Sequence, residues 1–327
     1  MRWGVVNEHL LKRFYKIEKE EARVLKIIDV HTHLGDILNP GGGELIEKTG
    51  VRKRRIFDPV SLSEAMLHRK FGMSRFINPL LGRWITMAEI ERNAIATREN
   101  FRKSMDEAGI RFSCCMPIPP YVTFEDLRRA SQKDAGIIPF TGIDYVHRDF
   151  EQTLARDVAN GAKGLKLHGI IQRMPLTSGD VFSAVEAFVP HGLPILIHCG
   201  VFSYYRGSRR ENEEPEYGKV QYAEKLISSF PKARFIVGHS GLFEVNEVIE
   251  RLYRYENVWV DTSFQPPSTI RKLIRAFGPE KVMYASDWPY GNRLPAVRAA
   301  KKACRGDRSL EDRIFWKNAA ELLKMNV

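Results

Sequence analysis

The sequence predicts an α/β fold, a single (β/α)8 barrel, and two observations support this prediction. Eight short apolar runs recur along the 327 residues, and charged segments with helical spacing separate them. The runs are continuously apolar rather than alternating, which is typical of parallel strands that are buried on both faces. Eight such units favour a barrel over a doubly wound sheet, because that sheet usually has fewer strands and a glycine-rich phosphate loop after the first one.

The expected strands begin near the N-terminus and continue almost to the end of the chain. They are the runs 24–30, 112–117, 137–142, 164–168, 194–198, 234–239, 258–261 and 281–287. Helical spacing of apolar residues predicts helices between and after the strands. These helices are 90–108, 124–133, 150–160, 179–189, 220–230, 244–255, 269–277 and 295–325.

Two further segments stand outside this repeat. Residues 35–87, rich in glycine and basic residues, are too many for an ordinary loop, so we expect an irregular insertion after the first strand that shapes the site. Its Gly41-Gly42-Gly43 cluster lacks a following Lys-Ser or Lys-Thr, which argues against a nucleotide-binding loop. Residues 1–23 carry apolar side chains at helical spacing and predict an amphipathic helix that packs on the barrel formed by residues 24–327.

The overall composition is that of a folded protein, with 43% hydrophobic and 28% charged residues. The net charge is +11, but the basic residues are interleaved with 40 acidic ones, so we expect neither nucleic acid nor a membrane surface as partner. Four cysteines without a Cys-x-x-Cys motif indicate no disulfide framework. We therefore expect a cytoplasmic protein that acts on a small molecule and that is either a monomer or a homo-oligomer.

Titratable side chains follow the apolar runs where several expected strands end. Most of the nine histidines are among them. The set is His31, His33, Lys166, His168, His198, His239 and Asp287. In a barrel the carboxyl ends of the strands meet at one mouth, where active sites lie, so we expect these side chains to converge. His31 and His33 are two residues apart and point the same way in a regular strand, which suits chelation of a metal ion.

Five segments, taken in order, resemble the amidohydrolase superfamily. They are His31-Thr32-His33, the run 164–168 with Lys166 and His168, the run 194–200 with His198, the run 237–241 with His239, and the run 284–289 with Asp287. The chain is most similar to the branch that contains metal-dependent hydrolases of the TIM-barrel fold and the aminocarboxymuconate-semialdehyde and resorcylate decarboxylases. The resemblance covers nearly the whole chain, from Ile27 to the segment 318–323.

The resemblance implies a divalent metal ion, with zinc as the first expectation. Its implied ligands are His31, His33, His198 and Asp287. Asp287 would also accept a proton from a metal-activated water. His239 would lie beside the metal, either as a catalytic residue or as a ligand of a second ion. The number of ions, one or two, stays open at this point.

Lys166 has two possible roles under the same resemblance. A carboxylated Lys166 would bridge two metal ions, whereas an unmodified Lys166 would pair with a substrate carboxylate or with Asp287; we favour the unmodified form. Candidate substrate-binding residues are Lys166, His168, Arg206 and Trp288. Arg206 lies with two further arginines after the fifth strand, where these side chains either bind a carboxylate or pair with the nearby acidic residues of 211–214.

The leading hypothesis for the reaction is hydrolysis of a carbonyl-type bond, in an amide, lactone or ester, by a metal-activated water acting on a small anionic substrate. The alternative is non-oxidative decarboxylation of an aromatic or unsaturated carboxylic acid, since the same ligands serve both reactions. A second alternative is a non-catalytic barrel stabilised by its metal. The sequence disfavours it, because no implied ligand is missing.

Overall fold

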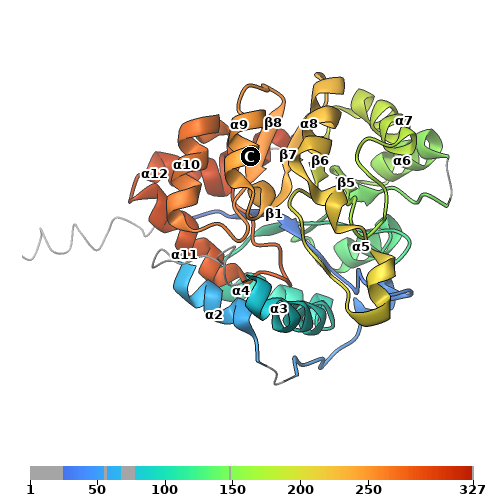
Figure 1. The fold of residues 1–327 in the computed structure, drawn as a ribbon, viewed down its shortest axis with the longest axis horizontal. Helices are drawn as coiled ribbons and strands as arrows, with labels where there is room; N and C mark the ends of the chain where they lie inside the picture. Colours follow the sequence, from blue (N-terminus) through green and yellow to red (C-terminus); the bar gives the residue numbers. More distant parts are fainter. Residues whose placement is uncertain (1–24, 55–56, 68–77, 147–148, 326–327) are drawn as a thin grey trace, which may run out of the picture.

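The computed structural model describes residues 25–54, 57–67, 78–146 and 149–325. Within them, β segments pair in parallel in chain order, and helices surround them (Figure 1). The segments are β1 Ile28–Thr32, β2 Phe112–Cys115, β3 Ile137–Pro139, β4 Thr141–Gly142, β5 Leu165–Leu167, β6 Pro194–Ile197, β7 Arg234–Val237, β8 Val258–Asp261 and β9 Val282–Met283. Each overlaps an expected strand, and β3 and β4 are the two halves of the strand expected over 137–142.

Backbone hydrogen bonds join these segments into a closed barrel. Between β3 and β4, the amide of Phe140 donates to the carbonyl of Cys115 in β2 at 3.0 Å, and β4 pairs in turn with β5. At the other junction, β1 pairs with the segment that follows β9, where the amide of Asp287 donates to the carbonyl of His31 at 2.8 Å. The predicted (β/α)8 barrel, a TIM barrel, is therefore confirmed.

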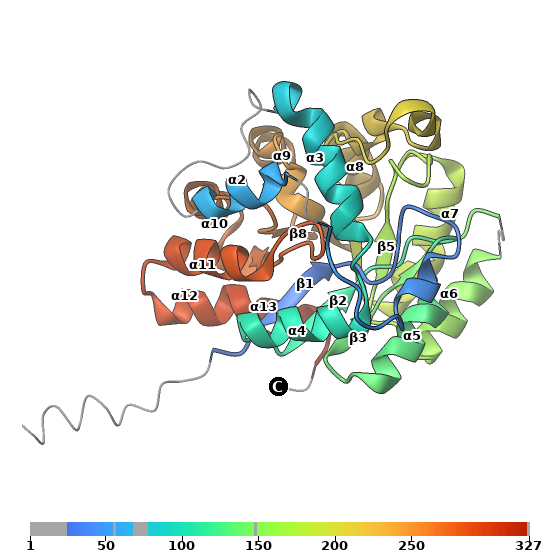
Figure 2. The same cartoon turned by 90° about the horizontal axis from the view of Figure 1, so that it is seen from below.

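The helices form the outer layer of the barrel (Figures 1 and 2). After the insertion they are α4 Arg98–Ala108, α5 Phe124–Lys133, α6 Phe150–Ala159, α7 Gly179–Phe188, α8 Val220–Ser229, α9 Val245–Leu252, α10 Pro267–Phe277, α11 Arg293–Cys304, α12 Arg308–Asp312 and α13 Asn318–Leu322. The helix expected over 295–325 is thus divided, with a π-helical turn at Arg313–Lys317 before α13. Short 3-10 turns lie at Gly42–Leu45, Val189–His191, Gly207–Asn212, Pro215–Gly218, Gly238–Gly241 and Pro279–Lys281.

Alternate residues of β6 belong to the two sides of the barrel wall. Ile195 and Ile197 belong to the apolar cluster that contains residues of α7 and α8, whereas Leu196 belongs to the interior cluster with Ile28 and Ile236. All five side chains are buried. The wall of the barrel is therefore apolar on both faces, as the continuous apolar runs predict.

A register shift in β1 departs from the regular strand that the sequence predicts. Asp29 pairs with Ser113, but Thr32 pairs with Cys115, so β1 has one more residue than β2 over this stretch. Val30 lies in the interior apolar cluster, and its neighbour His31 also reaches the interior polar groups described below. Bulges of this kind re-aim side chains next to active sites.

The insertion after β1 is more ordered than expected. It contains α2 Pro59–Leu67 and α3 Asn78–Asn93, so the expectation of an irregular segment over 35–87 is wrong for these parts. The helix expected over 90–108 is also divided, because Thr97 caps α4 by accepting a hydrogen bond from the amide of Asn100 at 3.2 Å. In Figure 2, α3 lies beyond the arrowhead of β1, at the carboxyl ends of the strands.

The amphipathic helix expected over 1–23 lies outside the described residues. Among the helices that are described, none combines the length and the apolar character needed to cross a membrane.

Candidate metal centre and active site

His31 lies at the centre of a buried polar cluster at the carboxyl ends of the strands. Its Nδ1 is 2.8 Å from Oδ2 of Asp261, the last residue of β8. Its Nε2 is 2.9 Å from Nζ of Lys166 in β5 and 3.6 Å from Oδ1 of Asp287, which follows β9. Four side chains from β1, β5, β8 and the end of the barrel therefore meet, and all are buried.

His33 approaches the same carboxylate oxygen as His31. Its Nε2 is 3.5 Å from Oδ1 of Asp287. Two atoms that each lie about 2.1 Å from one tetrahedral metal ion are about 3.4 Å apart, so both separations fit ligands of a single ion. Oδ1 of Asp287 is buried and has no hydrogen-bond partner among the described residues, and a cation would satisfy it. His31, His33 and Asp287 together can hold a metal ion.

The outer nitrogens of both histidines are committed to acceptors, which leaves the inner ones free to ligate. Nδ1 of His31 donates to the Asp261 carboxylate, and Nδ1 of His33 donates to the carbonyl of Met116 at 3.1 Å. Each Nε2 therefore carries a lone pair, which is how such contacts orient metal ligands. The lone pair of His31 accepts from Lys166 in this structure, so metal binding and that contact are alternatives.

His198 does not join this group directly but lies beside His239. Nε2 of His198 donates to the carbonyl of Gly200 at 3.0 Å, and its Nδ1 is 3.2 Å from Nε2 of His239. The hydroxyl of Ser263 donates to Asp261 at 2.6 Å and therefore accepts from Nδ1 of His239 at 2.8 Å. The lone pair on Nδ1 of His198, which is also 3.5 Å from the hydroxyl of Tyr204, consequently faces the lone pair on Nε2 of His239. A bound cation would relieve this repulsion.

Burial sets the protonation of these groups. Desolvation lowers the pKa of His31, His33, His168 and His239 well below its usual value, and that of His198 to about 3, so the imidazoles are neutral. Desolvation likewise lowers the pKa of Lys166 to about 7, although Asp287 opposes this shift. It raises the pKa of Asp287 well above its usual value. Burial therefore disfavours the charged form of each group, and a bound cation would stabilise the carboxylate of Asp287.

Asp261 and Asp287 hold the surrounding backbone in place. His239 and Asp287 adopt left-handed conformations, with φ of 57° and 59°. Such strain persists only where contacts enforce it. The amide of His239 donates to Asp261 Oδ1 at 2.9 Å, and the amide of Asp287 donates to the carbonyl of His31.

A second possible metal group, formed by His31, His239 and Asp261, is better explained as this hydrogen-bond network. Oδ2 of Asp261 is used by His31, and its Oδ1 accepts from the amide of His239 and from the hydroxyl of Ser263. Asp261 and Ser263 are not among the site residues predicted from the sequence. Asp261 could have been predicted, because it is the last residue of the expected strand 258–261, where a site residue is expected.

A small cavity of about 20 Å³ lies over the cluster. Asp287 and His239 form its polar side, and Glu89 of α3 lies on its wall. The rest of the lining is apolar or aromatic: Phe202, Tyr204, Leu242, Phe264 and Tyr290. Sequence reasoning missed Glu89, whose burial raises its pKa to about 8.

The four expected substrate-binding residues lie in different places. Lys166 is in the polar cluster, and the ring of His168 stacks on that of His198 with centroids 4.2 Å apart. Trp288 packs against Phe101 in the core and is not among the residues that line the cavity over Asp287. Arg206 lines a separate, larger cavity.

Comparisons with known proteins agree with this arrangement. Residues 28–325 match the family model described as amidohydrolase. A comparison with curated proteins finds no significant match.

Solved structures of low sequence identity share the fold. One is 5-carboxyvanillate decarboxylase from Novosphingobium aromaticivorans in complex with manganese, with 16% identity, a TM-score of 0.60, and coverage of 92% of this chain and 96% of that one. Another is 2,6-dihydroxybenzoate decarboxylase from Rhizobium, with 14% identity, a TM-score of 0.59 and coverage of 91% and 98%. A third is a probable 2-pyrone-4,6-dicarboxylic acid hydrolase from Acinetobacter baumannii, with 14% identity, a TM-score of 0.55 and coverage of 92% and 100%. The match over nearly the whole chain shows that this protein belongs to the amidohydrolase family.

Proposed function

We propose that this protein is a metal-dependent enzyme that decarboxylates an aromatic or unsaturated carboxylic acid without oxidation. The observation that carries the proposal is the lining of the cavity over Asp287. Phe202, Tyr204, Phe264 and Tyr290 surround it, and aromatic walls suit a planar, unsaturated substrate. The decarboxylases among the structures that share the fold support the same reaction class.

One divalent cation is the proposed cofactor, held by His31, His33, His198 and Asp287. The orphaned Oδ1 of Asp287 and the inward lone pairs of the histidines support this ligand set. Imidazole with carboxylate suits Zn²⁺, our first expectation, and Mn²⁺, which one neighbouring decarboxylase contains. A single ion is favoured because the oxygens of Asp261 are already in use.

The protein's own groups supply the remaining chemistry. When bound, the cation supplies positive charge for the substrate's oxygens. The carbon that bears the carboxylate first takes up a proton; the bond from that carbon to the carboxylate then breaks, carbon dioxide leaves, and the electron pair of the broken bond restores the unsaturated system. His239, Asp287 and Glu89 line the cavity and are the groups that can hold or deliver that proton. Lys166, unmodified in this proposal, contributes a buried amine beside His31.

Hydrolysis, the reaction that the sequence first suggests, is the second candidate. The probable 2-pyrone-4,6-dicarboxylic acid hydrolase among the fold neighbours supports it. Decarboxylation ranks higher because the structures that share the fold include two kinds of decarboxylase of aromatic acids, and because the side chains around Asp287 are mostly aromatic. The cytoplasmic location and the lack of nucleic-acid and membrane partners stay predictions of the sequence.

The test is an assay of the protein loaded with Mn²⁺ or Zn²⁺ on 2,6-dihydroxybenzoate, 5-carboxyvanillate and 2-pyrone-4,6-dicarboxylate in ¹⁸O-labelled water. We expect release of carbon dioxide from an aromatic acid, with no ¹⁸O in the organic product. Asp287→Asn should lower the rate by at least about 100-fold, while Asp106→Asn, on the exposed face of α4, should not change it. Incorporation of ¹⁸O into a ring-opened product would establish hydrolysis instead.

A further inference from the structure

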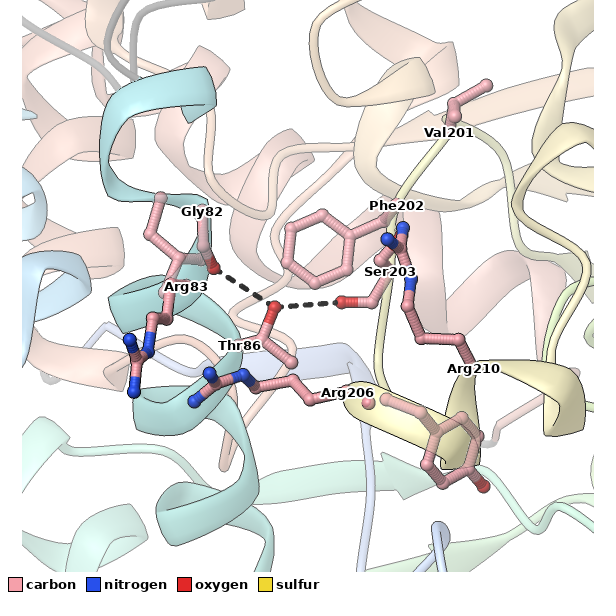
Figure 3. Close-up of a pocket in the computed structure, with 11 residues that line it drawn as sticks. Gly82, Arg83, Thr86, Val201, Phe202, Ser203, Arg206 and Arg210 are labelled. Carbon is pink, nitrogen blue, oxygen red and sulfur yellow. Dashed lines mark hydrogen bonds between the residues drawn. The ribbon is translucent and has the colours of Figure 1, made fainter.

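A second, much larger cavity of about 560 Å³ opens beside the metal centre (Figure 3). α3 forms one wall, and the loop that follows β6 forms the other. The hydroxyl of Thr86 in α3 contacts both walls. It is 3.1 Å from the carbonyl of Gly82 in α3 and 3.4 Å from the carbonyl of Ser203 in the loop. Three arginines line the cavity, Arg83 from α3 and Arg206 and Arg210 from the loop. We call it the arginine cavity.

No ion pair with a described residue neutralises the arginines of this cavity. None of its three guanidinium groups forms an ion pair with a described carboxylate, and Arg210 donates only to the hydroxyl of Ser203, at 3.3 Å. The ion pairs with the acidic residues 211–214 that the sequence allowed are not found there, although burial raises the pKa of Glu213 and the charge of Arg210 opposes this rise. Glu213 instead accepts a hydrogen bond from the amide of Tyr204 at 2.6 Å.

Arg209 shows what a structurally committed arginine looks like in the same turn. It donates to the carbonyl of Leu38 at 3.2 Å and to the side chain of Asn39 at 2.7 Å, and it lies over the ring of Tyr205 at 4.9 Å. Among the described residues, the arginines of the cavity have no comparable set of contacts. Guanidinium groups that line one cavity repel each other, and a bound oxyanion would relieve this and accept paired hydrogen bonds.

The arginine cavity adjoins the metal centre. Phe202 lines both cavities. Arg83, Thr86 and Glu89 are spaced by three residues and lie along one face of α3, with Arg83 and Thr86 at the arginine cavity and Glu89 at the metal centre. The six residues from Arg83 to Glu89 correspond to about 9 Å along the helix axis. One elongated molecule can therefore reach from the arginine cavity to the metal centre.

We propose that the arginine cavity binds a second oxyanion, a carboxylate or a phosphate, on the substrate whose reacting carboxyl group lies at the metal centre. The substrate is then an elongated molecule with an anionic group at each end. The inference that this molecule is the substrate rests on the proposed function. The inference that the cavity binds an anion follows from its arginines alone.

The test is calorimetric titration of the full-length, metal-loaded protein with terephthalate, inorganic phosphate and benzoate. In the double variant Arg83→Gln/Arg206→Gln, the affinity for terephthalate, for phosphate or for both should fall at least tenfold. The affinity for benzoate, which binds at the metal centre, should not change. Which anion loses affinity identifies carboxylate or phosphate. Arg298→Gln, which removes the same charge from an exposed position on α11, should change each Kd by less than twofold. Equal binding of terephthalate and phosphate to wild type and double variant would overturn the proposal.

Kinetics separate this inference from the proposed function. For any acid that is turned over, the double variant should raise KM for dianionic acids at least tenfold and leave KM for monoanionic acids unchanged. If the protein is an active decarboxylase and the double variant has the same KM for dianionic acids as the wild type, the role of the arginine cavity is refuted and the proposed function is not. Loss of phosphate or terephthalate binding in a protein that decarboxylates nothing supports the cavity and refutes the proposed function. Equal thermal unfolding midpoints of wild type and variant exclude a folding defect as the cause.

Discussion

Replacing Glu89 by glutamine should change how the stability of the protein depends on pH. Glu89 is buried in α3, and one of its carboxylate oxygens has no hydrogen-bond partner among the described residues. Burial raises its pKa from 4.5 to about 8; Glu64 and Asp58 add to this, and Arg92 opposes it. The folded protein therefore keeps a proton on Glu89 between about pH 4.5 and 8, whereas the unfolded chain has already released it.

The sign and size of the effect follow from that difference. Where the folded state binds more protons than the unfolded state, the free energy of unfolding falls as pH rises. One group contributes about 1.4 kcal/mol per pH unit. Between pH 5 and 7.5, Glu89 should therefore remove about 3 kcal/mol of stability from the wild type. Glu89→Gln cannot ionise and lacks this loss, so its stability relative to wild type should rise over the same range.

Urea unfolding at half-unit pH intervals, in buffer that contains a metal chelator, measures this difference. Glu91→Gln is the matched control, because Glu91 lies on the same helix and its nearest ion-pair partner, Arg54, is exposed. The Glu91→Gln curve should stay parallel to that of the wild type. If the Glu89→Gln curve is also parallel to it, Glu89 ionises normally in the folded protein and the reasoning from burial fails.

The remaining predictions concern the metal centre. Asp261→Asn should weaken metal affinity by about 10- to 100-fold in competition with a chromogenic chelator, because Asp261 orients His31; unchanged affinity would contradict that role. Removing the metal should lower the thermal unfolding midpoint, since a ligand at 100 times its Kd adds about 2.7 kcal/mol of stability, and an unchanged midpoint would refute a native site. Gly238→Ala should reduce both stability and metal affinity, as its Cβ would lie 2.8 Å from the carbonyl of Ile197 and 3.2 Å from the ring of His31; a variant that binds metal normally would contradict this. Native mass spectrometry should find the mass of the chain plus one metal ion. An additional mass equal to one carbon dioxide would contradict the unmodified form of Lys166.

The sequence predicts the barrel because its strands are defined locally. Each continuous apolar run is a strand signal in itself, and every described strand overlaps one. The side chains that follow those runs, such as His31 and Asp287, were predictable for the same reason. The register shift in β1 was not predictable, because it depends on the pairing with β2.

The residues that sequence reasoning missed depend on tertiary packing. Glu89 and Arg83 belong to a helix of the insertion, and only the docking of α3 over the strand ends brings them to the two cavities. Trp288 stands next to Asp287 in the sequence, yet its ring packs on Phe101 in the core. Proximity in sequence to a site residue therefore does not decide which way a side chain points.

The most direct test of the account is an anomalous difference map from a crystal of the protein grown with Mn²⁺. The account predicts one peak, bonded to Nε2 of His31, Nε2 of His33 and Nδ1 of His198 at about 2.0–2.3 Å and to the carboxylate of Asp287 at a similar distance. Two peaks bridged through Lys166, or no peak among these four side chains, would contradict it.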